Sequence, residues 1–251
     1  MIPWLADAPA FPPVRRALRD PNGLLAAGGA LTPEWLLAAY RKGIFPWYSR
    51  GEPILWWSPD PRLVLVPSEF KCSRSLKKRL RNRGFEVRFD TAFIQVVNAC
   101  AAPRADATGT WITPEMRNAY AGMHELGHAH SIETWLDGEL VGGLYGIAIG
   151  QVFFGESMFS RVADASKVAL AALCHHLVAR EFAVIDCQMT TAHLLSLGAR
   201  ELARSEFCAM LETLTTRGDP PGRWSADTVP DLCAVAAKES PPPCKRTTPT
   251  D

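Results

Sequence analysis

Two carboxylates stand in strongly apolar, strand-like runs of this chain, where packing favours apolar side chains. Glu156 lies in the segment 155–160, and Asp186 lies in the segment 185–188, which ends with Gln188. An ionised carboxylate is rarely buried without a partner or a chemical task. Two of them on neighbouring strands would indicate the floor of a polar site inside an otherwise apolar core.

The stretch between the two carboxylates has the pattern of a β-α-β unit. A strand is predicted from 151 onward, a helix begins at Asp164 as its N-terminal cap and runs to about Arg180, and a strand follows at 183–187. Such a crossover places its two strands parallel and in one sheet. We therefore expect Glu156 and Asp186 to lie close together.

The rest of the chain divides at about residue 62. Residues 1–62 are rich in Pro, Gly and Trp, and contain one helix predicted between Thr32 and Gly43. After that point, strands are predicted at 63–66, 85–89, 131–136 and 139–149, and helices at 73–83, 91–101 and 113–127. The strands at 131–136 and 139–149 should form a hairpin around the Asp-Gly turn at 137–138. We expect a small N-terminal domain (1–62), a larger domain (63–232) and a disordered tail (233–251).

Composition excludes several classes of protein. The 251 residues are 47% hydrophobic and 21% charged with a net charge of +1, so no global charge favours nucleic acid or membrane. Seven irregularly spaced cysteines without a CxxC pair argue against a disulfide framework or a zinc ribbon. No signal peptide is evident, and no apolar run approaches the ~20 residues of a membrane helix. We expect a cytoplasmic protein without a membrane segment.

The segment 124–128 reads His-Glu-Leu-Gly-His and matches the H-E-x-x-H pattern of zinc proteases. That pattern requires both histidines one turn apart on a continuous helix. Gly127 is predicted to end the helix and 129–135 alternates as a strand, so His128 should lie outside it. A helix end with exposed histidines is the alternative, and we expect no metal.

Two features would suit a nucleic acid. A basic helix carries four cations on one face, namely Arg74, Lys77, Lys78 and Arg81. That face is either solvated or placed on a phosphate backbone. Trp111 alone would be a packing residue, but with Trp47 it could form a stacking platform for a base.

An apolar cluster is predicted on the strands and helix around the two carboxylates. It consists of Leu144, Phe153, Met158, Leu173, Leu177 and Ile185. The same residue types form either a packed core or a pocket for one apolar side chain, and the sequence does not separate these two interpretations.

Taken in order, these segments resemble the bacterial leucyl/phenylalanyl-tRNA–protein transferases over residues 20–215. The matching stretches are 43–47, 55–62, 109–113, 124–132, 140–145, 155–161 and 185–188. The resemblance implies an α+β fold, with a small N-terminal domain before a larger acyl-CoA N-acyltransferase-like mixed sheet flanked by helices. It implies transfer of Leu or Phe, and also Met, from aminoacyl-tRNA to the α-amine of proteins that start with Arg or Lys. The product would enter N-degron proteolysis. We expect a monomer without a cofactor.

The resemblance also implies roles for single residues. Asp186 and Gln188 would sit at the reaction centre, and the apolar cluster would take the transferred side chain. Trp47 and Trp111 would line the site of the tRNA 3′-terminal adenosine. The acceptor stem would be held by Arg74, Lys78 and Arg81. The family often has Met at position 144 and aromatics at positions 173 and 177, so this pocket would have a different shape.

The reaction would be aminolysis of an ester, and its proton needs a carrier. A neutral amide is a poor proton acceptor, so we expect Gln188 to position the attacking amine. Asp186, or the ribose hydroxyl beside the ester, would carry the proton. Glu156 would hold an amino group, either that of the aminoacyl moiety or that of the acceptor.

Two other activities compete with this hypothesis. A coenzyme A-dependent N-acyltransferase would share the fold, but it needs a Gln/Arg-x-x-Gly-x-Gly/Ala turn before the helix at 164. Residues 160–163 read Ser-Arg-Val-Ala instead. An RNA-binding module without catalysis would leave Asp186 without a purpose.

Overall fold

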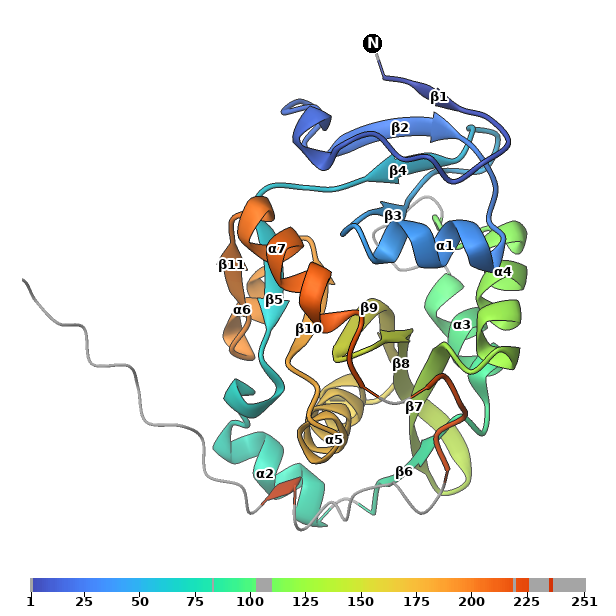
Figure 1. Ribbon diagram of the computed structural model, residues 1–251. Helices are drawn as coiled ribbons and strands as arrows, with labels where there is room; N and C mark the ends of the chain where they lie inside the picture. The colour runs from blue at the N-terminus through green and yellow to red at the C-terminus, as the bar shows by residue number, and fades with distance from the viewer. Residues whose placement is uncertain (1, 83, 103–109, 219, 226–234, 237–251) are drawn as a thin grey trace, which may run out of the picture.

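The computed structural model describes residues 2–82, 84–102, 110–218, 220–225 and 235–236. Its strands form a four-stranded sheet of order β1-β2-β4-β3 and a seven-stranded sheet of order β11-β5-β10-β9-β8-β7-β6 (Figure 1). Helices flank the larger sheet, so the α+β class is confirmed. Except for 235–236, the tail predicted to be disordered lies outside the described residues.

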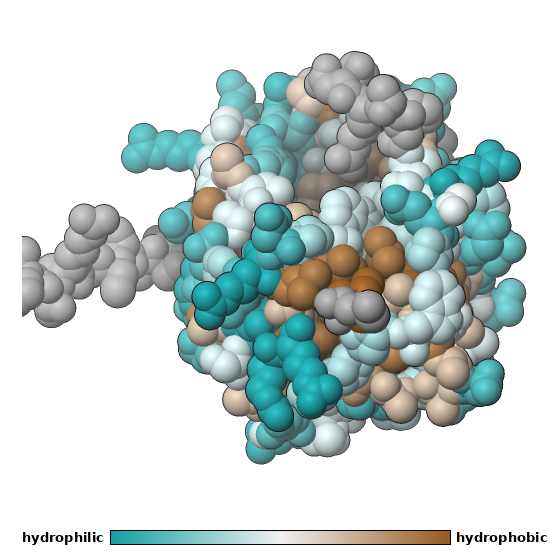
Figure 2. All heavy atoms as spheres, turned by 90° about the horizontal axis from the view of Figure 1, so that it is seen from above, coloured by the Kyte–Doolittle hydropathy of each residue, from teal (hydrophilic) through white to brown (hydrophobic). Residues whose placement is uncertain are grey.

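The small sheet and one helix make up the N-terminal part. The helix α1 spans Pro33–Tyr40, and the strands are β1 (Trp4–Leu5), β2 (Leu24–Gly28), β3 (Phe45–Pro46) and β4 (Leu55–Trp57). The predicted helix is confirmed, although the Thr32 side chain accepts no capping hydrogen bond. Trp35 and Trp56 stack with ring centroids 6.1 Å apart beneath the sheet. Seen from above, apolar side chains gather near the centre of the molecule, with strongly hydrophilic ones along one side and side chains of intermediate hydropathy along the other (Figure 2).

The large sheet contains the predicted hairpin and the predicted β-α-β unit. Its strands are β5 (Arg62–Leu65), β6 (Glu86–Phe89), β7 (Ala129–Leu136), β8 (Glu139–Ile149), β9 (Val152–Ser160), β10 (Val184–Gln188) and β11 (Arg200–Leu202). Asp137 and Gly138 both have positive φ, as a two-residue type I′ hairpin turn requires. Strands β9 and β10 pair in parallel, with Asp186 opposite Phe154.

The helices cover both faces of this sheet. They are α2 (Arg74–Asn82), α3 (Phe93–Ala101), α4 (Pro114–Glu125), α5 (Ala165–Ala179), α6 (Ala192–Ser196) and α7 (Arg204–Leu214), with 3-10 turns at Val14–Arg16 and Pro67–Glu69. Neighbouring residues alternate between two cores, as strand geometry demands. Tyr145 and Phe154 pack with α1, α3 and α4, whereas Leu144 and Phe153 pack with α5.

The expected cap of α5 differs from its observed structure. Asp164 precedes the helix with φ of 71°, and its carboxylate accepts no hydrogen bond from the backbone amides of the first turn. It pairs instead with Lys167 Nζ at 3.0 Å and Arg79 Nε at 3.2 Å, which ties α5 to α2. The Asp164 carboxylate is engaged in these ion pairs, and Ser160 Oγ accepts the Ser166 N–H of the first turn at 3.2 Å instead.

One break in the large sheet creates room for a site. Strands β9 and β10 are paired only as far as Phe154 and Asp186. Beyond that point β9 continues along β8 to Ser160, whereas β10 bulges and pairs Gln188 with Leu63 of β5. The two parallel strands therefore separate, and the residues after Phe154 and Asp186 face a gap.

Among the helices of the described residues, none combines the length and the apolarity needed to cross a bilayer.

Candidate active site

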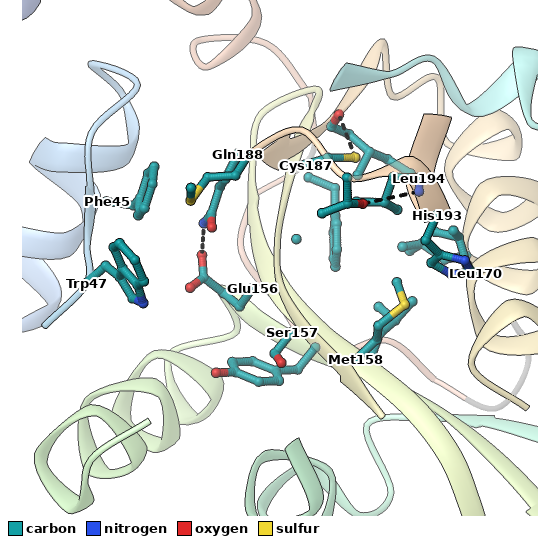
Figure 3. Close-up of a pocket in the computed structure, with 18 of the residues that line it drawn as sticks. Phe45, Trp47, Glu156, Ser157, Met158, Leu170, Cys187, Gln188, His193 and Leu194 are labelled. Atoms are coloured by element: carbon teal, nitrogen blue, oxygen red, sulfur yellow. Dashed lines mark hydrogen bonds between the residues drawn. The ribbon is translucent and has the colours of Figure 1, made fainter. Parts of the chain in front are cut away.

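A cavity of about 500 Å³ lies where β9 and β10 separate. Figure 3 shows Phe45 and Trp47 of the N-terminal part on one side, and Leu170 and His193 on the other. The inner wall is apolar and is formed by Leu144, Phe153, Met158, Leu170, Leu173 and Ile185. Size and lining are those of a pocket for a small molecule or side chain.

The predicted apolar cluster is largely the wall of this cavity. Five of its six members line the cavity, whereas Leu177 does not. Leu177 lies one turn beyond Leu173 on α5 and is fully buried in the core behind the wall. Leu170, one turn before Leu173, lines the cavity in its place.

Both predicted tryptophans line the same cavity. Trp47 is 38% exposed, and Trp111 is partly buried. The Trp57 indole nitrogen donates to the Trp47 carbonyl at 2.6 Å, and the two rings meet edge to face at 5.3 Å. The Trp47 ring is thus held in place while part of its surface stays open, which is the condition for stacking on a base.

Glu156 places its carboxylate in the polar part of the cavity. Tyr40 Oη donates to Oε1 at 2.8 Å, and Tyr120 Oη donates to Oε2 at 2.5 Å. Gln188 Nε2 donates to Oε1 at 2.9 Å (Figure 3). Burial raises the pKa of Glu156 to about 7, although the two tyrosine hydroxyls act to lower it.

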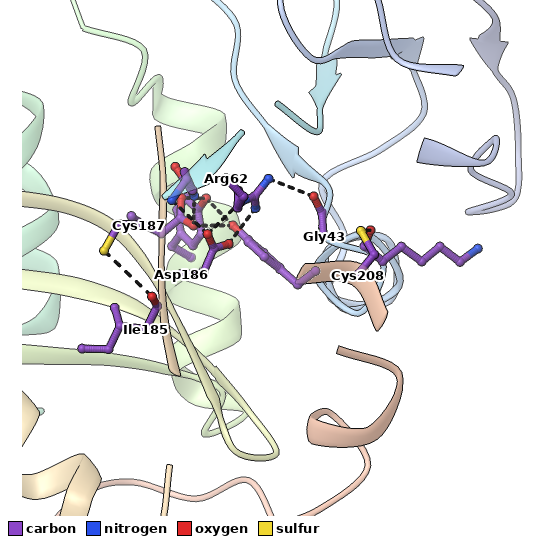
Figure 4. A network of polar contacts seen from close by, with 11 residues as sticks. Gly43, Arg62, Ile185, Asp186, Cys187 and Cys208 are labelled. Atoms are coloured by element: carbon purple, nitrogen blue, oxygen red, sulfur yellow. Dashed lines mark hydrogen bonds and ion pairs between the residues drawn. The ribbon is translucent and has the colours of Figure 1, made fainter. Parts of the chain in front are cut away.

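Asp186 does not line the cavity, whereas we expected Asp186, or the ribose hydroxyl beside the ester, to carry the reaction's proton. Its carboxylate is fully buried in a bidentate ion pair with Arg62, at 2.7 Å from Nε and 2.6 Å from Nη2 (Figure 4). Arg62 also donates to the Gly43 carbonyl at 3.0 Å. A carboxylate sealed in this way cannot reach a substrate amine.

Asp186 acts on the site through the backbone of Gln188. Its Oδ1 accepts the Gln188 N–H at 2.9 Å. Gln188 has φ of 61°, a left-handed conformation that a non-glycine residue holds only when its surroundings impose it. Gln188 is therefore fixed at both ends, by Asp186 at the backbone and by Glu156 at the amide. Its Oε1 has no hydrogen-bond partner among the described residues.

Three residues of this site had no role in the sequence-based predictions. They are Arg62, Tyr40 and Tyr120. A cation at the start of the apolar run 62–65 was the available signal for Arg62, because a buried arginine requires a buried carboxylate. Nothing in the sequence connects either tyrosine with Glu156, since each lies on a helix whose pattern is explained by packing.

The three basic residues expected at the acceptor stem lie on α2, outside the cavity wall. Arg74, Lys78 and Arg81 are all exposed. Arg81 Nη2 contacts the Ala236 carbonyl at 3.4 Å. The helix buries Leu76 and Leu80 and turns these three cations outward, as its spacing predicted, whereas Lys77 of the predicted face is partly buried.

The zinc-protease pattern is not realised. His124 lies in the last turn of α4, whereas His128 follows Gly127, whose φ is 76° and which ends the helix. The prediction that His128 lies outside the helix is confirmed. His124 is buried rather than exposed, with Nδ1 2.7 Å from the Ala129 carbonyl. In the described ranges, no three His, Cys, Asp or Glu side chains are grouped as metal ligands would be.

Comparison with known proteins identifies close relatives. The family model for leucyl/phenylalanyl-tRNA protein transferase matches residues 64–212, and that for the N-terminal domain of the same family matches 29–60. The leucyl/phenylalanyl-tRNA–protein transferase of Azoarcus sp. strain BH72 is 71% identical over 92% of this chain and 99% of its own. The leucyl/phenylalanyl-tRNA–protein transferase of Aromatoleum aromaticum is 65% identical over 92% of this chain and 98% of its own.

A solved structure gives a weaker likeness. The GCN5-related N-acetyltransferase from Kribbella flavida has 14% sequence identity and a TM-score of 0.33, and it covers 68% of this chain and 61% of its own. At that distance the likeness has no bearing on function.

Proposed function

The chain belongs to the leucyl/phenylalanyl-tRNA protein transferase family, and on that basis we propose that it transfers Leu or Phe, and also Met, to proteins that start with Arg or Lys. As a member of this family it is an aminoacyltransferase that moves an amino acid from aminoacyl-tRNA to a protein. The modified protein would then enter N-degron proteolysis. The observation that best supports the proposal is one cavity with an apolar end, a fixed Glu156–Gln188 pair and an open tryptophan.

The transferred side chain enters the apolar end. The walls there are the aliphatic and aromatic side chains of β8, β9, β10 and α5, without a charged group among them. Such a wall selects loosely, because one methylene is worth only about 1–3 kcal/mol. Leu, Phe and Met share an unbranched β-carbon, and a narrow entrance would exclude Ile and Val.

The tRNA 3′ end lies at the mouth. Trp47 and Trp111 stack on the terminal adenosine, which would set the ester bond beside Gln188. The acceptor stem then runs toward the exposed cations of α2, where Arg74, Lys78 and Arg81 contact its phosphates. These contacts contribute to the affinity for tRNA but do not distinguish between aminoacyl side chains. The apolar end of the cavity therefore selects the transferred amino acid.

The acceptor amine attacks from the Gln188 side. A free α-amine has a pKa of about 8, so a useful fraction is neutral at cellular pH. Gln188 Oε1 accepts a hydrogen bond from this amine and orients it, and much of the acceleration comes from holding amine and ester together. Asp186 keeps Gln188 in place and, being paired with Arg62, does not recognise the acceptor's Arg or Lys.

Transfer of radiolabelled Leu or Phe from charged tRNA tests this proposal. Three peptides that differ only in a first residue of Arg, Lys or Ala serve as acceptors. Label on the Arg and Lys peptides but not on the Ala peptide is the expected result. Label on all three would refute the acceptor rule, and label on none, with intact charged tRNA and folded protein, would refute the function. Coenzyme A thioesters would then be the next donors to test.

A further inference from the structure

Aminolysis of an ester requires a group that moves one proton. The attacking nitrogen must lose a proton after it bonds to the carbonyl carbon, and the departing ribose oxygen must gain one. Both atoms would lie at the mouth of the cavity if the proposed function holds, and the inference below depends on it. A side chain that titrates near neutral pH and faces both atoms would do this best.

Few side chains of the cavity wall can serve. Among the described residues that line it, the titratable ones are Tyr145, Glu156, Cys187 and His193, and burial holds the pKa of Tyr145 well above its usual value. Burial raises the pKa of the Cys187 thiol far above neutral, so this group keeps its own proton. Asp186 is closed off by Arg62, and the amide of Gln188 cannot hold a further proton.

Three hydrogen-bond donors position the Glu156 carboxylate for proton transfer. Two of them hold Oε1, whereas Oε2 accepts only from Tyr120 among the described residues. A carboxylate oxygen has two lone pairs, so Oε2 can accept one more proton donor. Gln188, which orients the amine, is hydrogen-bonded to the same carboxylate at 2.9 Å. An amine held by Gln188 is therefore within reach of Glu156.

We propose that Glu156 takes the proton from the attacking α-amine and returns it to the departing ribose oxygen, with Tyr40 and Tyr120 as its positioning residues. The neutral amine forms the C–N bond, and the ionised carboxylate accepts one N–H proton from the tetrahedral adduct. The C–O bond to the ribose then breaks, and the ribose oxygen takes that proton. The carboxylate ends ionised, and no other reactant is needed.

The electrostatics agree with this assignment. Burial raises the pKa of Glu156 to about 7, close to the pH at which a group exchanges protons in both directions. The hydroxyls of Tyr120 and Tyr40 favour the ionised form and act to lower that pKa, whereas the charge of Asp186 acts to raise it. The two tyrosines thus keep a buried carboxylate ionised often enough to act as a base.

The pH dependence of kcat/KM for an Arg-starting peptide tests the proposal. In the wild type, the acceptor amine and Glu156 must both lose a proton, so log kcat/KM should rise by about two per pH unit well below pH 7 and by about one between 7 and 8. For Glu156→Gln, log kcat/KM should rise by about one per pH unit throughout. Its kcat/KM at pH 8 should be about 10²-fold or more lower than that of the wild type. The proposal would be overturned if log kcat/KM of Glu156→Gln still rose by two per pH unit well below pH 7, or if its kcat/KM at pH 8 equalled that of the wild type.

The tyrosines provide a readout that a merely structural role would not change. Tyr40→Phe and Tyr120→Phe each remove a donor from the carboxylate, so the lower inflection should move to higher pH, while KM for charged tRNA stays constant. Glu212→Gln, an exposed change on α7, is the matched control and should leave the profile unchanged. If His193→Gln, rather than Glu156→Gln, lowered the slope of log kcat/KM below pH 7 from two to one, His193 would be the proton carrier. Wild-type transfer is measured in the same series, so a failure of the function itself would be seen separately.

Discussion

The ion pair between Arg62 and Asp186 should be the most sensitive point of the site. Arg62 and Asp186 have side chains that are 1% and 0% exposed, so Arg62→Met leaves an unpaired carboxylate in the core. Breaking a buried pair in this way costs about 3–5 kcal/mol. The guanidinium also lies 5.0 Å from the Phe45 ring centroid and 4.9 Å from that of Phe207, which links the N-terminal part to the large sheet. We expect Arg62→Met to lower the free energy of unfolding, measured by urea denaturation, by an amount in that range.

A surface pair supplies the matched control. Arg200 pairs with Glu69, and their side chains are 49% and 46% exposed. Arg200→Met should therefore cost at most about 1 kcal/mol. Equal losses for Arg62→Met and Arg200→Met would refute the reasoning.

A double variant separates the stability of the pair from its effect on the site. Arg62→Met combined with Asp186→Leu removes both charges, so it should be more stable than Arg62→Met alone. Transfer should remain impaired in the double variant, because the Gln188 N–H has lost its acceptor. Full recovery of transfer would show that Asp186 does not position Gln188.

Further predictions concern the cavity and the tRNA. Leu173→Ala widens the cavity and should raise the ratio of Phe to Leu transfer, whereas Leu177→Ala should cost about 2–5 kcal/mol of stability without changing that ratio. Trp47→Ala should raise KM for charged tRNA by about 5- to 150-fold, the equivalent of about 1–3 kcal/mol of stacking, with kcat less affected. Binding titrations from low to high salt should show a log–log slope reduced by about two to three when the α2 cations are changed to Gln, namely Arg74, Lys78 and Arg81.

The elements of the fold could be predicted because their signals are local. The Asp-Gly turn at 137–138 requires two positive φ angles, and the observed hairpin has both. The parallel pairing of β9 and β10 follows from the helix between them. Outward placement of the α2 cations follows from helical spacing alone. Each of these features depends on residues close together in the chain.

The site was predicted only in part because its contacts are distant in sequence. Arg62 and Asp186 are separated by 124 positions, and Tyr40 and Glu156 by 116. The periodicity of the sequence does not predict contacts between residues so far apart. Asp186 was therefore expected to contact the substrate rather than an arginine. The place of Leu177 was missed for a related reason, since helical spacing gives the buried side of α5 but not the end of the cavity.

A crystal structure with a non-hydrolysable analogue tests the central claim most directly. In 3′-phenylalanylamido-adenosine an amide replaces the ester. We predict that its phenyl ring lies among Leu144, Met158 and Leu173, its adenine stacks on Trp47 or Trp111, and its amide carbon lies beside Gln188 and Glu156. A phenyl ring outside this cavity, in a protein that still transfers Phe, would contradict the account.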